Sequence, residues 1–142
     1  MRNLYLSFLV AHVLVAILGV GSIASVAIVA GTARRTGRGS TGALIWLGPL
    51  LRYSGLSLAA MLATGILLGL TGGGVHQAGW FRASALLLIP TGVLHARARR
   101  ALRRGLANED DGDRVLRRVE WSAYGMCAII ALIAVLMEAK PF

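Results

Sequence analysis

The feature that most constrains this chain is a cluster of arginines that directly follows an apolar segment. The apolar run Ala83–Leu94 is followed, within ten residues, by Arg97, Arg99, Arg100, Arg103 and Arg104. Because a cluster of charged guanidinium groups cannot enter hydrocarbon, it fixes one side of a membrane. The rest of the chain is oriented from this cluster.

The composition places the remainder of the chain in a membrane as well. Of the 142 residues, 56% are hydrophobic and 15% are charged, whereas an average soluble domain has about 25% charged residues. A helix that crosses a bilayer needs about 20 apolar residues, and the chain holds apolar material for four. We therefore predict an all-α polytopic membrane protein, a single domain over residues 1–142 in which four transmembrane helices form one bundle.

The predicted spans cover about residues 4–30, 53–71, 80–100 and 121–137. The first is too long for the apolar core of a signal peptide, and arginines follow it as in a stop-transfer segment. Loops are predicted at the glycine-rich segments 31–42 and 71–79 and at the acidic segment 106–113. The third helix is expected to kink at Pro90, to continue into water through Arg104, and to stop at Gly105.

The start of the second span allows two interpretations. In the first, residues 43–51 lie at the interface, the chain breaks near Gly48-Pro49, and the span begins near Tyr53. In the second, the helix starts near Leu44 and carries Arg52 about two turns into the membrane. We favour the first, because residues 53–71 are long enough to span alone. A buried Arg52 would need a carboxylate, a haem propionate or a lipid phosphate as its partner.

Basic residues are distributed unevenly between the predicted loops. The first loop holds three arginines and the third holds eight, while the opposite side holds three Lys or Arg residues with Arg52 left out. If all four spans cross, these two basic loops share one side. The positive-inside rule then predicts a bacterial inner membrane protein with both basic loops in the cytoplasm and both termini outside it.

The net charge of +9 would suggest nucleic acid in a soluble protein, but here the arginines flank apolar segments. This arrangement favours anionic lipid headgroups and other membrane subunits as partners, and no nucleic acid. Positions 97, 100 and 104 fall on one face of a helix, and positions 99 and 103 on an adjacent face. The candidate residues for binding lipid or a partner are therefore Arg52, Arg97, Arg99, Arg100, Arg103 and Arg104.

His12 is the candidate cofactor residue. It lies about two turns inside the first span, on the face of Ala16 and Gly19, where polar groups point into the bundle. A hydrogen bond across a helix seam, a haem or copper ligand, and a proton relay all suit this position. Its only plausible partner as a ligand is His76, because His95 lies about 10 Å away in depth.

Other signatures of chemistry are absent from the sequence. It has no Cys-x-x-Cys or Met-x-x-Met spacing, no nucleophile elbow, no phosphate loop and no zinc motif, so no metal site and no catalytic residue are predicted. No acidic residue lies inside a predicted span, since Glu120 and Glu138 fall at interfaces. The seams between helices are expected at small residues, which include Gly19, Gly55, Gly65, Gly69 and Gly125.

Five segments carry a resemblance to a known family. They are AHVLVAILG at Ala11–Gly19, LATGILLG at Leu62–Gly69, Ile89-Pro90, the arginine-rich segment, and MEAKP at Met137–Pro141. Together they resemble a family of small four-helix bacterial membrane proteins of unknown function, which is loosely similar to the membrane domain of copper-resistance D-type proteins. The resemblance implies four helices and makes His12 the polar position to test.

These observations predict a small, non-catalytic integral membrane protein without a cofactor. We expect an accessory or structural subunit of a larger membrane complex, respiratory or photosynthetic. The alternative is a haem- or copper-handling membrane protein, with His12 as a ligand of haem b or copper.

Overall fold

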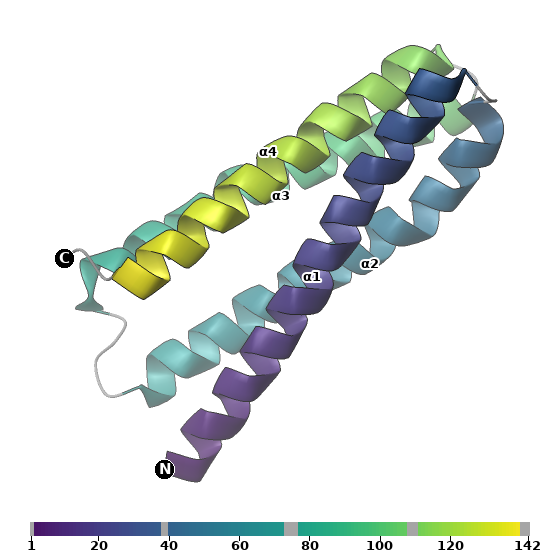
Figure 1. The fold of residues 1–142 in the computed structure, drawn as a ribbon. Coiled ribbons are helices and arrows are strands. Elements are labelled where there is room, and N and C mark those ends of the chain that lie inside the picture. The colour runs from purple at the N-terminus through teal and green to yellow at the C-terminus, as the bar shows by residue number, and fades with distance from the viewer. Residues whose placement is uncertain (1, 38–39, 73–76, 108–110, 140–142) are drawn as a thin grey trace.

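The structure, a computed structural model, describes residues 2–37, 40–72, 77–107 and 111–139. These residues form four helices, α1 (Arg2–Thr36), α2 (Ser40–Thr71), α3 (Gly79–Leu106) and α4 (Gly112–Ala139) (Figure 1). The predicted all-α class is therefore confirmed.

Three of the helices are long and apolar enough to cross a membrane. Within the described residues, the segments that meet this criterion are Asn3–Thr36 in α1, Gly42–Thr71 in α2, and Gly112–Ala139 in α4. α3 does not meet it, because six of its 28 residues are arginines and its longest stretch without charge is residues 83–96. Length and composition thus support a helical membrane protein with three candidate spans.

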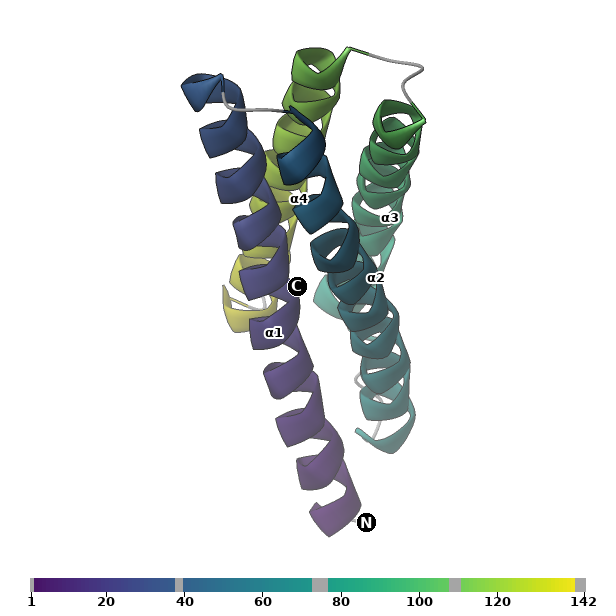
Figure 2. The same ribbon diagram turned by 90° about the vertical axis from the view of Figure 1, so that its right-hand side faces the viewer.

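The helices are arranged as two pairs, α1 with α2 and α3 with α4. The pairs pack together at the end of the molecule where α1 ends and α4 begins, and they diverge toward the opposite end (Figures 1 and 2). The apolar core lies in the closely packed half. Its fully buried large side chains are Ile23, Val26, Leu47, Leu51, Val115, Val119 and Met126.

The diverging half exposes many large apolar side chains instead of burying them. Leu14, Ile17 and Leu18 of α1 are more than half exposed, as are Ile66 and Leu70 of α2. Such surfaces are unfavourable in water, but they match lipid tails, which are as apolar as leucine.

The predicted loop at 31–42 is mostly helical, which corrects the sequence interpretation. α1 continues to Thr36 and α2 already begins at Ser40. Gly31 serves close packing rather than a turn, because a Cβ at this position would lie 2.7 Å from Glu120 Oε1. Gly37, with a φ of 59°, takes the left-handed conformation that commonly follows a helix end.

α2 is one continuous helix, so the favoured prediction of a break near Gly48-Pro49 is wrong. Pro49 lies inside the helix and is exposed, while Leu44, Leu47 and Leu51 of the same turns are buried in the core. This packing holds the first turns of α2 in place although proline removes one backbone hydrogen bond. The continuous helix of the alternative interpretation is confirmed, although it begins at Ser40 rather than near Leu44, and the depth of Arg52 in a membrane stays a prediction.

α3 runs one residue past its predicted stop and ends at Leu106. Gly105 lies inside the helix rather than at its cap, and α3 comes very close to two other helices at this residue. A Cβ at Gly105 would lie 2.9 Å from Val115 Cγ2 on α4 and 3.3 Å from Leu44 Cδ1 on α2. Of the predicted acidic loop at 106–113, residues 108–110 lie outside the described residues, and α4 begins at Gly112.

Candidate functional site

Two close contacts define how α3 and α4 lie against each other. A Cβ added to Gly125 of α4 would lie 2.9 Å from Leu94 Cδ1 of α3. A Cβ added to Gly105 of α3 would lie 2.9 Å from Val115 Cγ2 of α4. Position 94 is therefore level with 125 and position 105 with 115, so the two helices are antiparallel. As a result, the arginine-rich segment of α3 lies beside the first turns of α4.

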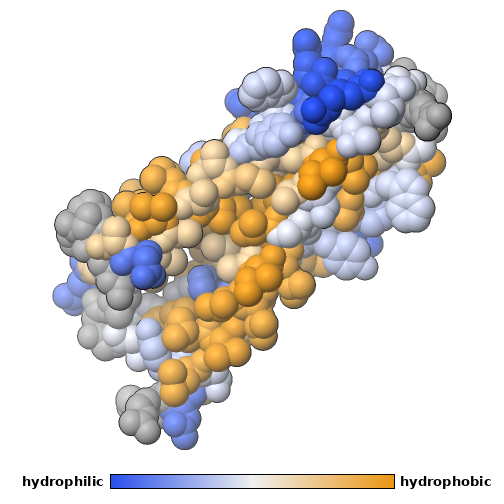
Figure 3. All heavy atoms as spheres, viewed as in Figure 1, coloured by the Kyte–Doolittle hydropathy of each residue, from blue (hydrophilic) through white to orange (hydrophobic). Residues whose placement is uncertain are grey.

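A groove of about 570 Å³ lies between these segments. We call it the arginine groove and define it by three arginines of α3 and three residues of α4: Arg97, Arg100, Arg104, Arg117, Arg118 and Trp121. Leu94, Ala101 and Ser122 complete its lining. Figure 3 shows strongly hydrophilic side chains gathered at the end of the molecule where α4 begins, next to apolar helix surfaces.

The groove includes some of the predicted binding residues and leaves out others. Arg97, Arg100 and Arg104 line it together, as their shared helical face predicts, while Arg99 and Arg103 are exposed outside it. Arg52 lies elsewhere, in a separate hollow with Gly48, Pro49, Tyr53 and Leu56. The structure thus brings together three of the six predicted residues.

Arg117 and Arg118 are groove residues that the sequence interpretation missed. The sequence interpretation includes them only in a basic loop, because residues 114–120 are polar. The available signal was the helical spacing of Arg114, Arg117 and Arg118 at the start of the last apolar segment. Their place opposite the arginines of α3 depends on the helix pairing, which a single sequence does not state.

The electrostatics of the groove favour an anion. Among the residues that the structure describes, Arg97, Arg100, Arg104 and Arg117 form no hydrogen bond or ion pair. Like charges held close together repel, and the repulsion grows as the local dielectric falls beside the apolar helix surface. A phosphate or carboxylate in the groove removes this repulsion and accepts the paired N–H groups that guanidinium presents.

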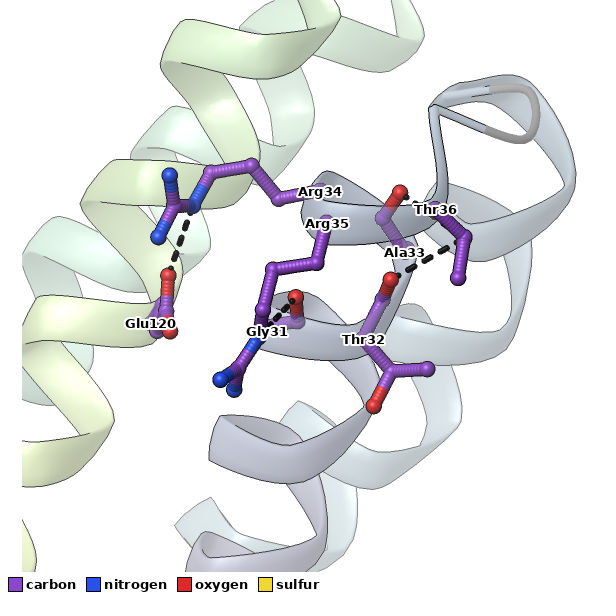
Figure 4. A network of polar contacts seen from close by, with 7 residues as sticks. All are labelled: Gly31, Thr32, Ala33, Arg34, Arg35, Thr36 and Glu120. Carbon is purple, nitrogen blue, oxygen red and sulfur yellow. Dashed lines mark hydrogen bonds and ion pairs between the residues drawn. The ribbon is translucent and has the colours of Figure 1, made fainter.

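An ion pair joins α1 to α4 at the same end of the bundle as the arginine groove. Arg34 Nε donates to Glu120 Oε2 at 2.9 Å, and the Glu120 side chain is only 7% exposed. Figure 4 shows Arg34 reaching across to Glu120, while Arg35 turns back and donates through Nε to the carbonyl oxygen of Gly31. The prediction that placed Glu120 at an interface missed this partly buried pair, because its two members are 86 positions apart.

His12 lies in the seam between α1 and α2. Its Nδ1 is 2.8 Å from Thr64 Oγ1, and Thr64 Oγ1 is itself 2.8 Å from the carbonyl oxygen of Ala60. The Thr64 hydroxyl thus contacts both His12 and the backbone of its own helix. Gly19, on the same face of α1, packs against Ser57, where an added Cβ would lie 3.2 Å away. This geometry agrees with the interhelical hydrogen bond that was one of three interpretations of His12.

His95 is buried in a second seam, between α2 and α3. Its Nε2 donates to the carbonyl oxygen of Leu51 at 2.9 Å, and its ring covers Gly55, where a Cβ would lie 2.7 Å from His95 Cε1. Leu51 and Thr64, the α2 residues that bond His95 and His12, are 13 positions apart, or about 20 Å along the helix. The structure therefore does not bring His12 and His95 together.

The proposed second ligand of His12, His76, lies outside the described residues. Within the described part of the chain, no group of three or more His, Cys, Asp or Glu side chains is placed to hold a metal ion. His12 also lines an apolar cavity of about 250 Å³ in the diverging half, together with Gly65, Phe81 and Ser84.

Comparisons of the chain with models of protein families, with curated proteins and with solved structures found no match. The family resemblance drawn from the sequence segments therefore stays a prediction.

Proposed function

We propose that this protein is a non-catalytic integral membrane protein that holds anionic lipid headgroups in its arginine groove and serves as an accessory or structural subunit of a larger membrane assembly. One observation carries the proposal. Five guanidinium groups from two helices converge on one groove, at the edge of apolar helices and beside the exposed ring of Trp121. Basic pockets between helices at the cytoplasmic surface are typical binding sites of acidic lipid headgroups.

In this proposal α3 crosses the membrane with the other three helices. It lies along α4 from Leu94 to Gly105, and α3 residues of the other half, Ser84 and Thr91, are buried too. A helix that packs along a spanning neighbour shares its depth in the bilayer. Arg82 and Arg97 then extend their side chains outward to the two interfaces.

The arrangement of the charged segments supports a four-span topology. If α3 did not cross, the first and third basic segments would lie on opposite membrane faces. The Arg34–Glu120 pair instead joins the end of α1 to the start of α4. By the positive-inside rule this end faces the cytoplasm of a bacterial inner membrane, and both termini lie outside it.

The surfaces available to partner proteins are of two kinds. The exposed apolar faces of α1 and α2 suit the helices of other membrane subunits, and the arginine groove suits an acidic cytoplasmic segment as well as lipid phosphate. Respiratory and photosynthetic complexes are the assemblies in which we place such a subunit.

The test compares two double variants that remove the same charge from the same helix. R100Q/R104Q removes two arginines of the groove, and R99Q/R103Q removes two arginines outside it with the same spacing. Each protein is purified in mild detergent and titrated with dioleoyl phosphatidylglycerol, and native mass spectrometry counts the bound lipid. At about 1 kcal/mol per arginine, we expect R100Q/R104Q to weaken retention about tenfold or more.

The matched variant R99Q/R103Q is expected to keep nearly the wild-type affinity, and the wild-type affinity is expected to fall as salt rises. Equal weakening in both variants would show a diffuse basic surface and refute the groove as the site. Unchanged retention in both would leave these arginines as orientation signals alone.

A further inference from the structure

The arginines of the groove are spread along the bundle between an outer level, at Arg104, and an inner level, at Arg97. The contact of Gly105 with Val115 places Arg104 level with Arg117, and the contact of Leu94 with Gly125 places Arg97 level with Ser122. Arg97 and Arg104 are seven residues apart on α3, which corresponds to about 10 Å along the helix axis. Arg100 lies between them.

We propose that the arginine groove binds one lipid molecule with two phosphates, of the cardiolipin class. One phosphate binds at the outer level, which is nearer the end of the bundle, between Arg104 and Arg117. The other binds at the inner level, which is nearer the middle of the helices, at Arg97 and Arg100. This inference rests on the proposed function, because it assigns the anionic lipid that the groove selects.

Two phosphates explain the charge and the length of the groove better than one. A single phosphate is far smaller than the separation of about 10 Å between the levels, so it leaves one level without a counter-charge. Two phosphates joined by a short bridge place one anion at each level. The second binding event is then intramolecular, which raises the overall affinity by a factor of about a hundred or more without any new kind of contact.

The lining of the groove selects a lipid rather than a soluble diphosphate. Its inner end is formed by Leu94 and by the ring of Trp121, which is 69% exposed. Tryptophan in this position is typical of the membrane interface, where its ring lies beside headgroups. Acyl chains can leave the inner end of the groove along the apolar surfaces of α3 and α4, which expose Val93 and Tyr124 nearby.

The experiment compares tetraoleoyl cardiolipin with dioleoyl phosphatidylglycerol at equal phosphate concentration, on the full-length protein in detergent. Native mass spectrometry reads out the number and affinity of bound lipids. We expect the wild-type protein to retain one cardiolipin and to bind it at least about tenfold more tightly, per phosphate, than phosphatidylglycerol.

A variant of the outer level tests the assignment of the two phosphates. R104Q/R117Q is expected to lose most of the preference for cardiolipin, because only the inner level remains and it holds one phosphate of either lipid. The control R99Q/R103Q keeps the preference. Circular dichroism checks the helix content of each variant, and the comparison of the two lipids on the wild-type protein does not depend on any variant.

The outcomes separate this inference from the proposed function. Equal affinity per phosphate for both lipids would overturn the two-phosphate site and leave anionic lipid binding intact. Binding of neither lipid above the level of dioleoyl phosphatidylcholine would overturn both. Displacement of cardiolipin by an equal concentration of glycerol bisphosphate, which has no acyl chains, would overturn the assignment to a lipid.

Discussion

At the scale of single residues, the polar side chains inside the bundle are nearly all bonded to a neighbouring helix or to their own. His12 bonds Thr64, His95 bonds the carbonyl oxygen of Leu51, and Glu120 accepts from Arg34. Within the described residues, Ser84 Oγ is the buried side-chain atom without a partner. Because lipid offers no hydrogen bonds, each of these bonds holds a particular pair of helices in register.

The bond between His12 and Thr64 predicts the effect of removing it. We expect His12→Ala to lower the free energy of unfolding by about 1 kcal/mol, as for one interhelical hydrogen bond in a membrane protein. Thr64→Val should cost a similar amount, and the double variant should cost less than the two single effects added together, because both remove the same bond. Thermal unfolding in a fixed detergent measures all three.

The absorption spectrum of the same samples tests the alternative function. If His12 only joins two helices, wild-type and variant proteins have the same spectrum. A haem or copper band that disappears in His12→Ala would instead support the cofactor-handling function.

At the scale of helices, glycines decide how closely neighbours approach. Gly55 admits the ring of His95, Gly125 admits Leu94, and Gly105 admits Val115. A Cβ added to any of these three glycines would lie within 3.0 Å of a side chain from another helix. The helices pack through small residues, as expected where no hydrophobic effect drives their association.

The fit of His95 over Gly55 gives a prediction with an internal control. Gly55→Ala places a Cβ 2.7 Å from His95 Cε1, so His95 must move away from the Leu51 carbonyl. We expect a loss of about 1–3 kcal/mol, the usual cost of overpacking. Gly48→Ala, in the same helix with no atom within 4 Å, should be neutral or stabilising because alanine favours helix. Equal unfolding midpoints for the two variants would contradict the packing of α3 on α2.

At the scale of the whole molecule, the closely packed half and the basic segments coincide at one end. The buried core, the Arg34–Glu120 pair and the arginine groove all lie there, while the diverging half exposes its apolar side chains. This asymmetry suits a bundle whose packed end lies at the cytoplasmic interface and whose other half lies in contact with lipid or partner helices.

The proposed topology has a direct test in reporter fusions. A reporter that is active only after export, such as alkaline phosphatase, should be active when fused after Phe142 and inactive when fused after Asn108, because the last span separates these two positions. A cytoplasmic reporter should give the opposite pattern. An active exported reporter at Asn108 would show that either the orientation or the crossing of α3 is wrong, and would overturn the proposed topology.

The sequence by itself determined the class of the protein. Runs of apolar residues and scarce charges predict segments that face lipid, and they predict helices because lipid leaves every backbone group to be bonded within its own segment. The helical period alone placed Arg97, Arg100 and Arg104 on one face. The depth of His12 within the first span predicted that its side chain lies between two helices. Each of these conclusions depends on residues that are close together in the chain.

Only the tertiary structure decided what depends on distant residues. The continuity of α2 through Pro49 follows from the core that its first turns bury, and the pairing of Glu120 with Arg34 joins positions that no local pattern connects. The groove likewise exists because antiparallel packing sets Arg117 and Arg118 beside the arginines of α3. Helix propensity and charge are local properties, whereas a site made by two helices depends on which small residues let them approach, and at which level.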